Sequence, residues 1–362
     1  MSTLNDRVRE RTSRFCALTG VTLPLMNAPM ADIAGVEMAA AVSEAGGLGV
    51  LAADFMTPEA LSDAVADIRR RTSRPFAVHL RAEIRRAMNE AEIDRINDAL
   101  VELKEEIGAG AVTALPDFSQ QFDALLKAGP AVAYVSFGGL REAQAEALRR
   151  AGIRLIAAAT TLREAKVMRS AEADAVVVQG AEAGGPRLTF EVADDAGRVG
   201  LLSLIGPAAR ATGLPVIASG GLMTGAQIAG ALVAGAGAVE LGTALLRTEE
   251  SRAHPAHQAA LSFLSDSGAQ WQRTTSGRLT RGVRTGLVEA LEAADVAAAA
   301  YPEQWMAMRS IELAARRQNR DDLMEMACGQ GAPLARTGRV ADVVATLVRE
   351  GREAGLEWGE EK

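Results

Sequence analysis

Short apolar runs alternate with helix-forming segments along most of this 362-residue chain, and this alternation limits the folds open to it. About eight runs have the length and composition of buried strands: 23–26, 48–52, 76–80, 131–135, 154–158, 173–179, 215–219 and 238–241. Helical segments that end near glycine lie between them, at 36–45, 58–71, 140–151, 162–171, 201–212 and 225–234. Because buried strands joined by helices form βαβ units, the pattern predicts an α/β fold, a TIM (β/α)8 barrel, with an open doubly wound sheet as the alternative.

Two segments interrupt this period. Residues 81–108 are highly charged, which is typical of a solvated surface helix. Residues 250–334 are too long for a loop and begin where the last strand ends, on the face of a barrel that carries its chemistry. We therefore expect a barrel over residues 1–250, a mostly helical cap over 251–335, and a C-terminal helix in 336–362 that returns to the barrel.

Composition excludes several classes of protein. With 48% hydrophobic and 23% charged residues, the chain has enough apolar surface to fold. A net charge of -7, with both signs interspersed, argues against a nucleic-acid partner. The two cysteines, Cys16 and Cys328, form no CxxC motif or Cys/His cluster, so no metal site is expected. No stretch is apolar enough for a membrane span, and we expect a soluble, cytoplasmic protein without a membrane partner.

Glycine-rich turns follow the seventh and eighth predicted strands. Gly220 and Gly221 close the seventh strand before a helix that opens at Thr224, and Gly242 and Thr243 close the eighth. On a barrel these two turns bind phosphate, because bare backbone N–H groups can face the anion. The alternative is that the glycines only make tight turns. The glycines at 47–49 close a helix and lead into a strand, which is the wrong context for a dinucleotide fingerprint.

Further motifs complete a pattern that covers nearly the whole chain. They lie at 24–30 (PLMNAPM), 45–49 (AGGLG), 179–185 (QGAEAGG), 242–251 (GTALLRTEES), 276–278 with 281–282, and 329–331 (GQG). In this order the motifs resemble the nitronate monooxygenase (2-nitropropane dioxygenase) family of FMN-dependent barrels. The resemblance implies a TIM barrel with a helical cap and a non-covalently bound FMN.

The same resemblance implies which residues hold the cofactor. The phosphate would rest on Gly220, Gly221, Gly242 and Thr243. The isoalloxazine ring would lie near Asn27, Ala28, Pro29, Met30 and Gln179, with Gln330 of the cap above it. Gly180, Gly184, Gly185 and Ser219 belong to the same cofactor-binding motifs.

The chain departs from the family pattern after the double glycine. The family has a histidine there that resembles the base for the α-proton of a nitroalkane, whereas this chain has Pro186 followed by Arg187. Because a positioned general base contributes about 10²–10⁴ in rate, oxidation of neutral nitroalkanes should be impaired, and an anionic nitronate should suffer less. Arg187 is a candidate clamp for an anionic substrate, or else an exposed loop residue.

A second departure is His79, at the end of the third predicted strand, where the family usually has an asparagine that touches the flavin. One interpretation is that His79 replaces the asparagine as a hydrogen-bond partner for FMN. The other is that His79 is a catalytic residue, a relocated acid or base.

The expected function is therefore that of an FMN-dependent oxidoreductase that oxidises a nitronate, a nitroalkane or a related small anion at an altered site. Two alternatives stay open: an enzyme similar to flavin-dependent enoyl reductases, and a non-redox barrel that binds FMN or a phosphate ligand. The partner of the flavin is O2 or a reduced nicotinamide. The sequence leaves open whether the chain forms a homo-oligomer and whether the loop at 188–199 closes over the site.

Overall fold

Eight parallel strands form the centre of the molecule in a computed structural model that describes residues 3–84, 87–110, 114–293 and 297–358. Their spatial order is β1-β9-β8-β6-β5-β4-β3-β2. The strands are β1 (Leu25–Asn27), β2 (Gly49–Ala52), β3 (Phe76–Arg81), β4 (Val132–Ser136), β5 (Arg154–Ala159), β6 (Ala175–Gln179), β8 (Val216–Ser219) and β9 (Ala238–Leu241). A parallel bridge between Met26 and Leu48 joins β1 to the start of β2 and closes the barrel.

Asn27 strengthens this closure. Its Nδ2 atom donates to the carbonyl oxygen of Val50 at 2.8 Å, and its Oδ1 accepts from the Val50 amide at 2.7 Å. The buried side chain thereby replaces the two backbone hydrogen bonds of a strand pair and links β1 to β2.

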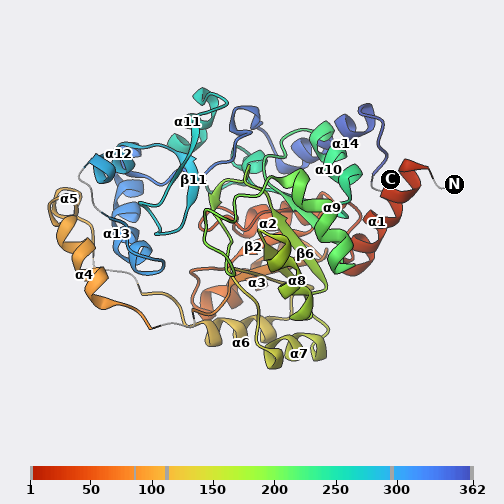
Figure 1. Ribbon diagram of the computed structural model, residues 1–362, viewed down its shortest axis with the longest axis horizontal. Coiled ribbons are helices and arrows are strands. Elements are labelled where there is room, and N and C mark those ends of the chain that lie inside the picture. The colour runs from red at the N-terminus through yellow and green to blue at the C-terminus, as the bar shows by residue number, and fades with distance from the viewer. Residues whose placement is uncertain (1–2, 85–86, 111–113, 294–296, 359–362) are drawn as a thin grey trace.

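Helices surround the barrel (Figure 1). They are α1 (Leu4–Thr19), α2 (Val36–Glu44), α3 (Pro58–Arg71), α6 (Phe118–Ala128), α7 (Glu142–Arg150), α8 (Leu162–Ser170), α9 (Leu201–Thr212), α10 (Gly225–Ala234) and α14 (Val340–Glu353). One apolar cluster fills the barrel and includes Met26, Tyr134 and Ile217, while a larger one lies between the strands and the helices. The strands are apolar on both faces: their inward side chains belong to the first cluster and their outward side chains to the second.

The cap lies to one side of the barrel's mouth (Figure 1). Its elements are α4 (Glu90–Ala99), α5 (Val101–Glu106), α11 (Pro255–Phe263), α12 (Gly286–Ala293), α13 (Glu303–Gln318), the strands β10 (Ala269–Gln272) and β11 (Thr280–Val283), and the short helices η2 (Asp321–Leu323) and η3 (Ala332–Leu334). β11 also pairs with β7 (Gly185–Pro186), a short strand in the loop between β6 and α9. The chain after β6 is therefore part of both the barrel and the cap.

The predicted barrel is confirmed, and the doubly wound alternative is wrong. Helices α3, α9 and α10 have the expected bounds, and the final helix covers nearly the expected span, whereas α1 and α6 were not predicted. The cap contains a β-hairpin as well as helices. The expected surface helix in 81–108 is two helices, and α4 buries Ile93 and Ile96 toward α13.

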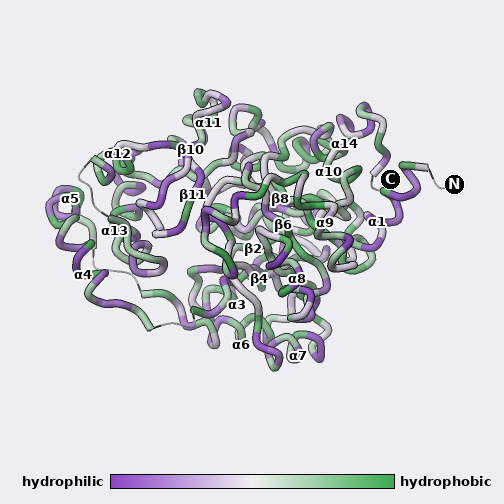
Figure 2. The backbone as a smooth tube through the Cα atoms, viewed as in Figure 1, coloured by the Kyte–Doolittle hydropathy of each residue, from purple (hydrophilic) through white to green (hydrophobic). Residues whose placement is uncertain are grey.

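In Figure 2, hydrophilic residues recur along α4 and α5 between hydrophobic ones, as expected of helices with one exposed face. The division of the chain at residue 250 stays a prediction, to which the structure adds α4 and α5 on the cap side. Among the described residues, no helix combines the length and apolarity that a membrane crossing requires.

Candidate active site

One cavity opens at the carboxyl ends of the barrel strands and extends under the cap. Its barrel wall comes from residues at or just after the ends of seven strands: 28–33, 54–55, 79, 81, 136–137, 179, 183–186, 188, 219–223, 240, 242–243 and 246. Its cap wall includes His257, Ser276, Trp305, Arg309, Glu312, Arg316, Glu325, Ala327 and Gly329. This is the face on which TIM barrels carry their active sites.

Free backbone amides face the cavity after β8 and β9. Within the described residues, the N–H groups of Gly220, Gly221, Leu222 and Thr243 donate to no acceptor, although all four residues line the cavity. Backbone N–H groups that line a cavity and have no partner in the protein are free to bind an anion, so these four make the two turns a candidate anion-binding cradle. We refer to Gly220, Gly221, Leu222 and Thr243 as the amide cradle.

The start of α10 contributes less to this cradle than its position suggests. The amides of Met223 and Thr224 donate to Oε1 of Gln227, at 2.8 and 3.1 Å, and the Gly225 amide donates to Glu350 at 2.9 Å. The helix N-terminus is therefore largely capped from within the protein, and the free donors lie in the turn before it.

Two glycines in this region are required by geometry. Gly221 has a φ of +68°, and a Cβ atom there would lie 2.9 Å from Cβ of Glu182. A Cβ on Gly184 would lie 2.4 Å from the backbone carbon of Cys328, in the cap loop. The first glycine keeps the cradle open, and the second lets the cap loop approach the barrel.

Most of the residues that the family resemblance assigns to the cofactor line this one cavity. They are Ala28, Pro29, Met30, His79, Gln179, Gly184, Gly185, Ser219, Gly220, Gly221, Gly242 and Thr243. Asn27, Gly180 and Gln330 do not line it: the Asn27 side chain is bound to Val50, the Gly180 carbonyl accepts from Arg187, and Gln330 is exposed.

His79 lies at the floor of the cavity within a chain of hydrogen bonds. Its Nδ1 is 3.1 Å from Oδ2 of Asp54, and its Nε2 is 2.8 Å from Oγ of Ser136. Arg81 Nε donates to the other oxygen of Asp54 at 2.8 Å. Burial alone would raise the pKa of Asp54. The hydrogen bonds and charge interactions with His79 and Arg81 outweigh the effect of burial and lower this pKa to about 2. Neither ring nitrogen of His79 is free for a substrate.

Arg187 is buried, with 0% of its surface exposed, so the exposed-loop interpretation is wrong. Its guanidinium donates to the carbonyl oxygens of Gly180, Gln179 and Gly197 at 2.7–2.8 Å, and it is absent from the cavity lining. Burial lowers the pKa of Arg187 to about 10, so it stays charged at neutral pH. A contact with substrate stays a prediction, and the visible role of Arg187 is to hold the loop after β6.

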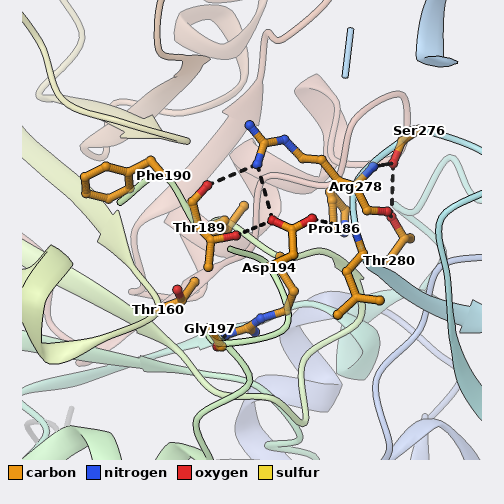
Figure 3. Close-up of polar contacts among 12 residues, drawn as sticks. Thr160, Pro186, Thr189, Phe190, Asp194, Gly197, Ser276, Arg278 and Thr280 are labelled. Atoms are coloured by element: carbon orange, nitrogen blue, oxygen red, sulfur yellow. Dashed lines mark hydrogen bonds and ion pairs between the residues drawn. The ribbon is translucent and has the colours of Figure 1, made fainter. Parts of the chain in front are cut away.

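Asp194 anchors the same loop to the cap. Its carboxylate accepts from Thr189 Oγ1 at 2.5 Å, from the Leu279 amide at 2.8 Å and from Arg273 at 3.0 Å. Figure 3 shows Asp194 between Thr189 and Arg278, whose Nη1 atom also donates to the Thr189 carbonyl at 3.0 Å. In this structure the loop at 188–199 is hydrogen-bonded to the cap hairpin.

We expect Arg187→Met to destabilise the protein by at least about 2 kcal/mol, because each buried carbonyl left without a donor costs roughly 1–3 kcal/mol. Urea unfolding measures the change. Arg198→Met is the matched control: among the described residues, the half-exposed Arg198 side chain pairs only with Asp195 in the same loop, so its loss should cost less than about 1 kcal/mol. Equal stability of the two variants would contradict the role given to Arg187.

Two acidic groups of the cavity were missed in the sequence. Glu240 of β9 accepts from Ser219 Oγ at 2.6 Å, and burial raises its pKa to about 7. Glu325 lies on the cap wall, and burial beside Glu312 raises its pKa to about 7 as well. Neither belongs to a recognisable motif, although the acidic position of Glu240 in the middle of an apolar strand was a signal that sequence analysis could have used.

A closed barrel of parallel strands with a cavity at their carboxyl ends, under a cap, defines an enzyme of the TIM-barrel class. Comparison with known proteins narrows the class. Residues 12–350 match the family model for nitronate monooxygenase, so the chain belongs to that family of flavin-dependent oxidoreductases, as its motifs predicted.

Curated relatives agree with this assignment. A nitronate monooxygenase of Pseudomonas aeruginosa is 35% identical over 94% of this chain and 99% of its own, and one of Paraburkholderia phytofirmans is 33% identical over 92% and 93%. Among solved structures, nitroalkane oxidase from Streptomyces ansochromogenes superimposes with a TM-score of 0.88 at 32% identity, covering 94% of this chain and 99% of that one. FabK from Thermotoga maritima, at 23% identity and a TM-score of 0.75, covers 94% and 96% and shares the fold.

Proposed function

We propose that this protein is an FMN-dependent oxidoreductase that oxidises small anionic nitronates in preference to neutral nitroalkanes. The observation that carries the proposal is the amide cradle, whose four free N–H groups suit a single phosphate at the barrel mouth. FMN has one phosphate, whereas FAD needs donors for a pyrophosphate and a second nucleotide. When bound, the flavin supplies the electron-accepting group of the reaction.

The residues around the cavity have distinct parts in this proposal. The amide cradle holds the phosphate, while Ala28, Pro29 and Met30 border the ring. Gln179 Nε2 donates to the Pro186 carbonyl at 3.2 Å, which positions the loop between the barrel and the cap hairpin. The loop at 188–199, held by its hydrogen bonds to the cap hairpin, and the cap itself exclude bulk water from the site.

The preference for an anion follows from the groups that line the cavity. Pro186 offers no base for the α-proton of a neutral substrate. Arg81, Arg309 and Arg316 also line the cavity, and each is ion-paired with a lining carboxylate, of Asp54, Asp32 and Glu312 respectively. The preference therefore rests on the missing base at position 186, since a nitronate needs no deprotonation.

The visible spectrum of the purified protein tests the proposal. Flavin absorption bands, release of FMN rather than FAD on acid denaturation, and O2-dependent turnover of ethyl nitronate are the expected results. Bound FMN with turnover only in the presence of a reduced nicotinamide would instead favour the enoyl reductase-like alternative. A colourless protein that cannot be loaded with FMN would favour a non-redox barrel and overturn the proposal.

Cytoplasmic location is part of the same proposal and is supported by the absence of a disulfide between Cys16 and Cys328. A homo-oligomer stays a prediction that sedimentation would test.

We expect His79→Asn to keep the flavin and to lower turnover by less than about tenfold, because His79 has both ring nitrogens bound and acts as a positioning residue. Turnover against pH, with flavin content measured on the same sample, is the readout. A fall of about 10²–10⁴ together with loss of one limb of the pH profile would give His79 the catalytic role that its place in the sequence suggested.

A further inference from the structure

Glu325 lies in the cap segment that continues the small sheet beside Pro186. β7 pairs with β11 through Pro186–Thr280 and Gly185–Arg281, and the pairing that follows along the same edge of β11 joins Gly282 to Ala327. Residues two apart in an extended segment face the same way. Pro186, Ala327 and Glu325 all line the cavity, so Glu325 on the cap wall borders the same space as the position where the family has its histidine.

The neighbouring acid, Glu312, is committed to other partners. Its Oε1 accepts from Arg316 Nε at 2.5 Å, and its Oε2 accepts from the backbone amide of Glu325 at 2.6 Å. The carboxylate of Glu325 makes no ion pair of its own among the described residues, and Thr275 is its side-chain hydrogen-bond partner. Of the two acids, Glu325 is the one available to a substrate.

We propose that the Glu325 carboxylate accepts the α-proton of neutral nitroalkanes, and so takes the part that Pro186 cannot play. The inference rests on the proposed function and adds a second substrate class to it. The C–H bond breaks, its electron pair remains on the substrate and spreads onto the nitro oxygens, and the proton binds a Glu325 oxygen. The product is a nitronate anion and a carboxylic acid, which returns its proton to water.

The environment of Glu325 suits this task. Burial and the negative charge of Glu312 raise the pKa of Glu325 to about 7, against the opposing effects of Thr275, Arg316 and Arg81. A base with a pKa near the working pH combines a substantial ionised fraction with a strong drive to take the proton. Arg309 and Arg316 line the same wall and would stabilise the negative charge that develops on the nitro group.

Other titratable groups of the cavity are less suited. His257 Nε2 lies 3.1 Å from the Ala327 carbonyl, and burial beside Arg316 lowers the pKa of His257 to about 4, which makes it a weak base. His79 is bound at both nitrogens, and Asp54 is bound to His79 and Arg81. Glu240 has a raised pKa but lies on the barrel floor, bound to Ser219.

The test compares nitroethane with pre-formed ethyl nitronate in the flavin-loaded protein. Glu325→Gln should lower kcat/KM for nitroethane about 10²–10⁴-fold more than for ethyl nitronate, because only the neutral substrate needs the base. Glu240→Gln is the matched control and should change both substrates by a similar factor. An equal loss for both substrates in Glu325→Gln, with flavin retained, would overturn the proposal.

A second measurement does not depend on oxidation. In D2O without oxygen, the parent protein should accelerate exchange of the α-protons of nitroethane, followed by proton NMR, and Glu325→Gln should lose that acceleration. Unchanged exchange in the variant would contradict the role of Glu325. Failure of the parent to oxidise ethyl nitronate would reject the proposed function instead, so the two failures are distinguishable.

The pH dependence provides a third readout with a defined sign. Only ionised Glu325 can accept a proton, so kcat/KM for nitroethane should rise with pH through about pH 7. Glu312→Gln removes a negative neighbour and should lower the pKa of Glu325, which moves the rise to lower pH. A rise that stays in place or moves to higher pH would contradict the assignment.

Discussion

We expect the Gly221→Asp variant to purify without flavin. A Cβ at this position would lie 2.9 Å from Cβ of Glu182, so the aspartate would crowd the turn that forms the amide cradle and bring a negative charge next to the phosphate. Two unit charges about 4 Å apart repel by roughly 4 kcal/mol at an effective dielectric constant of about 20. Flavin absorbance per protein, and FMN titration of the stripped protein, measure the loss.

Two control variants separate charge from backbone strain. Gly221→Asn has nearly the same bulk without the charge, and asparagine tolerates the left-handed conformation about as well as aspartate. It should bind FMN more than about tenfold better than Gly221→Asp. Gly108→Asp also places aspartate at a positive φ, of +57°, but in open space remote from the cavity, and should keep full flavin. Full occupancy in Gly221→Asp would place the phosphate elsewhere.

The Pro186→His variant should raise turnover of nitroethane relative to ethyl nitronate by at least about tenfold. The new imidazole would face the cavity from the position where the family has its histidine, and a general base changes the rate only for the substrate that must lose a proton. The Pro186 carbonyl, which accepts from Gln179, is a backbone group and survives the change. Steady-state kinetics on both substrates at several pH values are the measurement.

Combination with Glu325→Gln sharpens this result. If Glu325 is the present base, Pro186→His should restore nitroethane turnover that Glu325→Gln has removed. Pro186→Asn is the control, because asparagine adds a similar polar group that cannot accept the proton. The same gain in Pro186→Asn and Pro186→His would show that the proline ring, and not the lack of a base at position 186, limits the parent enzyme.

Local sequence was sufficient to predict the barrel and the glycine turns that line its cavity, while their role as a phosphate site stays a prediction. A strand that is apolar on both faces, or a glycine turn such as Gly220–Gly221, can be recognised from a few consecutive residues. The cap hairpin β10–β11 was missed because its strands are short and part of its pairing is with β7, from a distant part of the chain. Long-range pairing leaves no period in the sequence.

The polar side chains of the cavity also depend on contacts between distant parts of the chain, which sequence analysis does not detect. Asp54, His79 and Ser136 belong to three different strands or the turns after them, and only the parallel pairing of β2, β3 and β4 brings them within hydrogen-bond distance. Arg187 follows the residue that replaces the family's histidine, yet its guanidinium is directed to three backbone carbonyls, because the fold of the loop after β6 encloses it. The sequence therefore predicted which segments line the cavity, but not the direction in which their side chains point.

Recombination of barrel and cap between family members will succeed only when three stretches of sequence are exchanged together. The cap hairpin is hydrogen-bonded to β7 and to Asp194, both of which are encoded in the barrel half, and α13 packs on α4, encoded near the middle of that half. A single crossover near residue 250 would cut all of these contacts at once. Chimeras that also transfer the segments around 90–106 and 180–199 would preserve them, which makes those segments the natural units for grafting a new specificity onto this barrel.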